Sequence, residues 1–298
     1  MSGVRPEGRV PWLRSVLLWL VLVLYITTFW GRFGPQWPGW VRAHAGRLAR
    51  ATWKVYLHAT IDEGARARVR DQRTVEEQRA VWAASSMLFG GFVPLGAVLV
   101  CGRRPRDVGL GRPNRWGWRV VVIGMLVTVP FAYAFAGERM DGPATALQRL
   151  PWWVQLVLVA GVSVPEHFLL TGVGVAGLLP NGRLPTHRPL ATVDGGPGKR
   201  ILRWLGLAQP ADPGLSLGGR FLAWWGLDGP ALVAILGGGL LFGLVHVGAQ
   251  PIELATSFPG GVGVCYVTYR SGSIWPAWLI HMGQMVWVTA FLAVRGGG

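Results

Sequence analysis

The amino-acid sequence predicts an all-α membrane protein, a polytopic bundle of about seven transmembrane helices. The 298-residue chain is 51% hydrophobic and only 14% charged, whereas soluble domains are about one quarter charged. Seven stretches also carry almost no charge, and most of them approach or exceed the about 20 residues that cross a bilayer. These stretches are residues 15–31, 80–102, 120–137, 150–182, 229–252, 254–269 and 271–294.

The seven stretches differ in how well they fit a transmembrane helix. The first is predicted to be a retained helix and not a signal peptide, because no small-residue cleavage site follows it. The fourth is the longest and is interrupted only by Glu166. The sixth is the shortest and contains Pro259, so it is the weakest candidate.

The net charge of +15 lies in the segments between the apolar stretches. In a membrane protein such residues set the orientation and contact anionic lipid head groups. They favour the lipid bilayer, and not nucleic acid, as the partner of the basic segments. Counting Arg and Lys predicts a cytoplasmic N-terminus in a multi-pass protein of the cell (inner) membrane.

Two regions are predicted along the chain. Residues 1–151 hold the first helices and a long basic segment, in which residues 39–79 have the pattern of an amphipathic surface helix. Residues 152–298 form a second membrane core with a Pro/Gly-rich loop at 181–227, which includes a short helix near 199–207. Glycines at 172–177 and 237–243 are expected to let helices approach closely.

Three of the C-terminal stretches contain ionisable side chains. Glu166, His246 and His281 each occur where a bilayer-crossing helix is otherwise apolar. Such groups are costly in the membrane and usually face the bundle interior for a functional reason. Pro165 is expected to kink the helix directly before Glu166. A buried carboxylate beside imidazoles can take a proton from water, and an imidazole can stabilise an oxyanion. The structural alternative is that neighbouring helices simply satisfy each group.

At these residues the sequence resembles the CAAX prenyl protease / bacteriocin-processing (CPBP) glutamic intramembrane proteases. The family shows Glu-Glu-x-x-x-Arg, then Phe-x-x-x-His, then a His that Asn follows four residues later. Phe242 to His246 matches the second motif, and the run at residues 273–277 leads into His281 as in the third. Glu166 matches the first Glu. The resemblance covers about Trp152 to Val294.

The resemblance implies an endopeptidase that cleaves a membrane-anchored protein or peptide without a cofactor or metal. It implies Glu166 as general base, His246 as the residue that positions water with it, and His281 as oxyanion stabiliser. A myxosortase-like branch, which processes C-terminal sorting signals, is the preferred subgroup; leader peptides are the other substrate class.

Three positions depart from the family pattern. His167 replaces the second Glu, Thr171 replaces the Arg, and Met285 replaces the Asn. Because the first two changes remove both partners of a buried ion pair, they leave two neutral groups that can hydrogen-bond and support Glu166. Gln284 is expected to supply the amide that Met285 lacks.

Other roles and classes remain open at this point. Glu253 is a candidate for reading a basic residue of the substrate. A zinc metalloprotease is one alternative, since a carboxylate and two or three imidazoles can hold zinc with an open position. A non-catalytic membrane binding or immunity protein of the same fold is the other, because the Arg and the Asn are missing.

Overall fold

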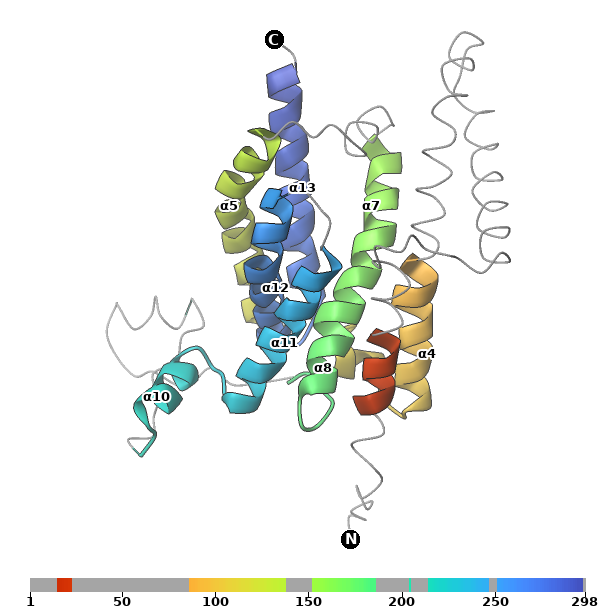
Figure 1. Cartoon of the computed structure of the whole chain (residues 1–298), viewed down its shortest axis with the longest axis vertical. Coiled ribbons are helices and arrows are strands. Elements are labelled where there is room, and N and C mark those ends of the chain that lie inside the picture. Colours follow the sequence, from red (N-terminus) through yellow and green to blue (C-terminus); the bar gives the residue numbers. More distant parts are fainter. Residues whose placement is uncertain are drawn as a thin grey trace.

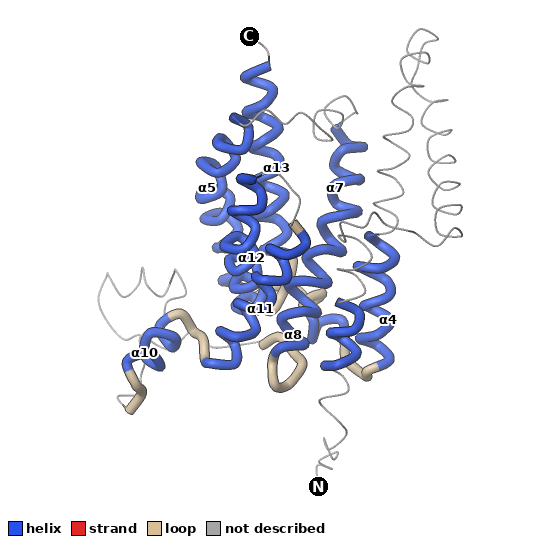
Figure 2. Tube along the Cα trace, in the orientation of Figure 1, coloured by secondary structure: helices blue, strands red, loops and turns tan. Residues whose placement is uncertain are grey.

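The computed structural model describes residues 15–22, 86–137, 152–185, 204, 214–246 and 251–296. The regular elements of the described residues are all helices, joined by loops, and no strand occurs among them (Figure 2). The all-α prediction is therefore confirmed. The elements after the helix at residues 15–22 are η1 (Ser86–Phe92), α4 (Val93–Val100), η2 (Pro105–Val108), α5 (Arg115–Gly137), α7 (Trp152–Glu166), η3 (His167–Gly174), α8 (Val175–Leu178), α10 (Leu217–Trp224), α11 (Gly229–Val245), α12 (Pro251–Ser271) and α13 (Trp275–Gly296).

Two of the described helical segments are long and apolar enough to cross a membrane, namely Arg115–Ala136 and Val159–Leu178. A third crossing results if α10 and α11 are taken as one bent segment. The predicted number of seven crossings stays a prediction, as does the division of the chain at residue 151. The amphipathic pattern at residues 39–79 lies outside the described residues.

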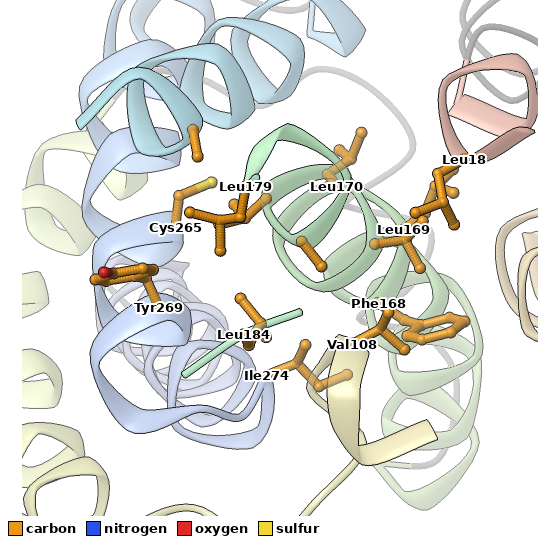
Figure 3. Packing of buried hydrophobic residues seen from close by; sticks show 14 of the residues in the cluster. Leu18, Val108, Phe168, Leu169, Leu170, Leu179, Leu184, Cys265, Tyr269 and Ile274 are labelled. Atoms are coloured by element: carbon orange, nitrogen blue, oxygen red, sulfur yellow. The ribbon is translucent and has the colours of Figure 1, made fainter. Parts of the chain in front are cut away.

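The helices pack in two groups around α7 and α8 (Figure 1). α11 packs along α12, and α13 packs along α5. The short helix at residues 15–22 places Leu18 and Leu22 against the continuous helix formed by α7, η3 and α8. Figure 3 shows the resulting core, in which buried side chains from η3 and α12 meet Val108 of η2 and Ile274.

Glycine permits the closest helix contacts, as predicted from the sequence. A Cβ on Gly239 of α11 would lie 2.8 Å from the backbone nitrogen of Val262 in α12. A Cβ on Gly172 of η3 would lie 2.4 Å from the carbonyl oxygen of Val108. A larger residue at either position would require a shift of the backbone, so Gly239 sets how near α12 comes to α11 and Gly172 sets how near η2 comes to η3.

One end of the bundle gathers the loops that carry arginine. The Ile274 N–H donates to Gly109 O at 3.0 Å, and the Leu184 N–H donates to Asp107 O at 2.8 Å. The Arg103 guanidinium donates to Asn181 O at 2.6 Å. These bonds tie together the loops after α4, after α8 and after α12. The loops that carry Arg103 and Arg183 therefore lie at the same end of the described bundle as the end of α12; the orientation in the membrane stays a prediction.

The Pro/Gly-rich loop predicted at 181–227 is partly helical. Most of residues 199–207 lies outside the described residues, but α10 forms at Leu217–Trp224. The Ser216 side chain caps this helix by accepting from the Gly219 N–H at 3.2 Å. Two glycines inside α10 concealed it in the sequence, because glycine weakens a helix prediction.

The contact at Gly172 gives a testable prediction. Gly172→Ala is expected to destabilise the fold by about 1–3 kcal/mol, since the added methyl group meets the Val108 carbonyl and must push η2 away from η3. Gly96→Ala in α4 is the matched control, because a Cβ there meets no atom within 4 Å. Thermal unfolding in detergent measures both variants. Equal midpoints for the two variants would contradict this packing.

Candidate active site

Glu166 lies at the end of α7, in the interior of the bundle. Only 5% of the residue is exposed. Pro165 has no N–H to give to the carbonyl of Gly161, so the regular α-helical pattern cannot continue unchanged here. The chain changes to π-helical winding from His167 to Gly174, and such turns often accompany functional sites. The kink expected at Pro165 is thus a change of winding within the helical segment Val159–Leu178.

His246 caps the C-terminus of α11 and faces the carboxylate. Its Nδ1 lies 2.7 Å from the carbonyl oxygen of Phe242. A carbonyl only accepts, so Nδ1 carries the hydrogen, and it is Nε2 that presents a lone pair when the ring is neutral. That Nε2 lies 3.9 Å from Glu166 Oε1. The separation exceeds a direct hydrogen bond and matches a gap that one water molecule can bridge.

The buried His167 and the half-buried His281 form a second pair. Their ring centroids are 5.0 Å apart. His167 Nδ1 lies 2.9 Å from Ser163 O, and so carries the hydrogen by the same reasoning. His167 Nε2 and His281 Nδ1 are buried and have no hydrogen-bond partner among the described residues.

The aromatic ring of Phe242 joins the two pairs. It stacks on His246 with centroids 5.1 Å apart and lies 5.9 Å from the His167 ring and 6.4 Å from the His281 ring. The structure therefore brings Glu166, His246, His167 and His281 into one cluster from separate elements, namely α7, α11, η3 and α13.

Thr171 lies one helical turn after His167 and contacts the backbone of the cluster. Its hydroxyl donates to the carbonyl oxygen of His167 at 2.7 Å. It also accepts from the Thr268 hydroxyl of α12 at 3.1 Å. His167 and Thr171 are thus both hydrogen-bonded, as the sequence suggested, but neither side chain bonds to the other.

Ser163 and Trp278 were not among the residues predicted for the site, but they contact each other beside it. The Trp278 indole N–H donates to the Ser163 hydroxyl at 2.9 Å, and that hydroxyl donates to Met282 Sδ at 3.5 Å. Ser163 lies one turn before Glu166, and Trp278 one turn before His281. The Ser163 hydroxyl thus fixes the register of α7 against α13, and the carbonyl of the same residue orients the His167 ring. A polar residue one turn before Glu166 was the only available signal.

Three further predicted residues have less defined surroundings. Gln284 is half-buried, and its side chain makes no hydrogen bond with the described residues. Met285 is also half-buried, and its carbonyl accepts from the Thr289 hydroxyl at 2.9 Å. Glu253 lies in the first turn of α12, and its side chain is outside the described residues. The expected roles of Gln284 and Glu253 stay predictions.

The same cluster was the candidate zinc site of the sequence analysis. Within the described part of the chain, no three His, Cys, Asp or Glu side chains are arranged to hold a metal ion. The Nδ1 atoms of His246 and His167 are both engaged by backbone carbonyls. Those contacts leave the Nε2 atoms as the ring nitrogens available for a ligand, so only the arrangement of the side chains, and not the ring contacts, disfavours zinc here.

A helical bundle with a buried carboxylate and imidazoles is an arrangement suited to a membrane-embedded hydrolase. Residues 146–287 match the family model described as Rce1-like, type II CAAX prenyl endopeptidase Rce1-like. This segment, just under half of the chain, is similar to the Rce1-like endopeptidases of the CPBP family, which the motifs also resemble. No curated protein and no solved structure shows a significant match to the chain.

The family of this model is one of endopeptidases. The matched segment contains every residue of the cluster. The myxosortase-like branch is not addressed by the match and stays a prediction.

The hydrogen bond between Ser163 and Trp278 can be measured by a double-mutant cycle. Trp278→Phe, Ser163→Ala and the double variant are expected to show a coupling free energy of about 0.5–1.5 kcal/mol, because both single changes remove the same bond. Trp287→Phe on the same helix is the control, since that ring is 36% exposed and stacks on Phe291. Additive effects of Ser163→Ala and Trp278→Phe would show that the bond does not hold α7 to α13.

Proposed function

We propose that this protein is a multi-pass glutamic endopeptidase of the cell (inner) membrane, which hydrolyses a peptide bond of a membrane-anchored substrate. The observation that carries the proposal is the facing of Glu166 Oε1 and His246 Nε2 across 3.9 Å inside the bundle. Two acceptors at that spacing can hold one water molecule between them, with one O–H directed at each. That is the arrangement in which a carboxylate acts as general base.

The first step forms the carbon–oxygen bond. The Glu166 carboxylate takes a proton from the water, and the resulting hydroxide oxygen attacks the carbonyl carbon of the scissile peptide. The carbonyl π electrons move to oxygen. Nε2 of His246 accepts a hydrogen bond from the second O–H of the water. This bond directs a lone pair of the water oxygen at the carbonyl carbon. The Phe242 carbonyl keeps this ring in the tautomer that accepts.

The second step breaks the carbon–nitrogen bond. The tetrahedral oxyanion reforms the carbonyl, and the amine leaves with the proton that Glu166 had taken from water. His281 stabilises the oxyanion by donating a ring N–H, and Gln284, one helical turn further along α13, supplies a second donor. A lost oxyanion donor costs about 2.7–4 kcal/mol. Met285 occupies the position of the family Asn and cannot donate, so the amide of Gln284 takes that role.

His167 and Thr171 serve as supporting residues. The Ser163 carbonyl fixes the His167 ring, and Thr171 fixes the His167 backbone and contacts α12 through Thr268. Two neutral, hydrogen-bonded groups beside Glu166 leave its charge as the only one in the cluster. The mechanism uses no metal and no cofactor.

The substrate is proposed to be a C-terminal sorting signal, as in a myxosortase-like branch, or a leader peptide. Both classes present a short polar segment beside a membrane anchor, which suits a buried cluster of this kind. Glu253, at the start of α12, is the proposed residue for binding a basic side chain of the substrate.

A non-catalytic membrane binding or immunity protein is the second candidate function. Met285 favours it, because a thioether cannot donate to an oxyanion. In that case the buried cluster would be a polar lining for a bound partner, and loss of the Glu166 charge would leave substrate termini unchanged.

Replacing Glu166 tests the general base. Glu166→Gln keeps the shape of the side chain but removes its basicity, so processing is expected to fall by at least about 10²–10⁴-fold while the protein stays inserted. The measurement compares membrane-protein termini, by mass spectrometry, in a strain without the gene and in strains complemented with each variant.

The matched control is Asp228→Asn. This carboxylate caps the other end of α11 by accepting from the Ala231 N–H at 2.9 Å, and Asn caps a helix equally well. The control should restore wild-type termini. Restoration by Glu166→Gln as well would rule out the glutamic mechanism.

Metal removal separates the proposal from the metalloprotease alternative. Because Glu166 and His246 activate water alone, cleavage by the purified protein is expected to be unchanged by strong chelators, and elemental analysis should find less than stoichiometric zinc. Loss of cleavage on chelation, with recovery on addition of zinc, would favour the metalloprotease instead.

A further inference from the structure

The short helix α10 stands apart from the bundle at the end where α11 begins (Figure 1). It is inclined by 64° to α11 across a break of at most four residues. α11 alone has 17 residues, a length of about 25 Å that already reaches the lower limit for crossing a bilayer. α11 therefore needs no extension by α10 in order to cross.

One face of α10 is apolar and exposed. Leu217, Phe221 and Trp225 are 86%, 59% and 36% exposed. Their spacing of four residues places them on the same side of the helix. A soluble surface would leave these three side chains in water at a substantial cost, so their exposure points to a partner.

The apolar face continues into the outer surface of α11. Val233, Leu236, Leu240 and Leu244 are between 42% and 62% exposed and recur every three or four residues. On a bilayer-crossing helix such a stripe faces lipid. The face of α10 thus extends a lipid-facing surface at its end, where it meets the membrane–water boundary.

Aromatic rings mark that boundary. Trp225 packs edge-on against Trp224 and against Tyr266 of α12, with centroids 5.9 and 6.2 Å apart. The Tyr266 hydroxyl donates to the carbonyl oxygen of Trp225 at 3.1 Å. Tryptophan and tyrosine concentrate at head-group level, because one end of each side chain is apolar and the other is polar.

Positive charge lies at the same end of the molecule. Arg220 is exposed on α10 itself, and Arg270 at the end of α12 donates to the carbonyl oxygen of Gly226 at 3.4 Å. The loops that carry Arg103 and Arg183 meet at this end too. Such a surface attracts anionic lipid head groups.

We propose that α10 is an interfacial anchor that lies along the membrane surface. Its Leu217–Phe221–Trp225 face enters the acyl boundary of the bilayer, and Arg220 lies among anionic head groups. Because Trp225 and Gly226 are bonded to α12, the anchor fixes the depth of the α11–α12 pair and hence of His246. This role is independent of whether Glu166 is catalytic.

The experiment uses the full chain in vesicles of phosphatidylcholine with phosphatidylglycerol. A nitroxide is attached to single cysteines at Phe221→Cys and, as the control on the opposite face, at Ala223→Cys, after Cys101→Ala and Cys265→Ala. Collision with oxygen reports lipid, and collision with a water-soluble nickel complex reports water.

The ratio of oxygen to nickel accessibility is expected to be severalfold higher at position 221 than at 223, with a depth at 221 of about 5–10 Å. High nickel accessibility at both positions would overturn the proposal, since the face would then be in water. High oxygen accessibility at both would overturn it in favour of a bent membrane crossing. Low accessibility to both reagents at 221 would also overturn it, since a second protein copy would then cover the face in place of lipid.

A second measurement tests the lipid charge. In vesicles of phosphatidylcholine alone, the ratio of oxygen to nickel accessibility at position 221 is expected to fall. Arg220→Gln should reduce the difference in this ratio between the two vesicle types. A ratio that does not depend on lipid charge would overturn the anionic part of the proposal.

Discussion

The structure depends on how a carboxylate is kept inside a helical bundle. Glu166 is 5% exposed, and a buried charge requires polar partners. Here the partners come from a helix end and not from an opposing charge. α11 stops at Val245, so the His246 ring turns back to its own helix and presents Nε2 to the carboxylate. The proposed water chemistry follows from that geometry.

The surrounding packing is what keeps these groups in register. A glycine in α11 lets α12 approach it to backbone contact, and a glycine in η3 does the same for η2. The Ser163–Trp278 bond then sets α13 against α7, one turn away from both Glu166 and His281. Proline and the π-helical turn at residues 165–174 widen the helix at the level of the cluster. A rigid frame of this kind limits the imidazoles to few arrangements, which a site for positioned water needs.

Much of this could be predicted from the sequence. Charge-free stretches revealed the helical membrane fold, and the order of the motifs indicated that Glu166, His246 and His281 belong together. The glycine positions indicated close helix contacts. Each of these signals is local, because a residue type or a run of residues carries it directly.

Two kinds of feature could not be predicted. One is which turns of two helices meet, and the other is a helix whose composition is that of a loop. Nothing in the sequence pairs Ser163 with Trp278, since helical spacing alone does not say which turns of two helices meet. His167 was expected to support Glu166, but its pairing with His281 arises only from packing around Phe242. α10 was missed because its glycines and its Pro/Gly-rich surroundings resemble a loop.

The most direct test of the central claim is an experimental density map that resolves ordered water between α7 and α11. The account predicts one water within hydrogen-bond distance of both Glu166 Oε1 and His246 Nε2, with His246 Nδ1 still bonded to the Phe242 carbonyl. A direct contact between the carboxylate and the imidazole that leaves no room for water would contradict it. A His246 ring turned away from Glu166 would contradict it as well.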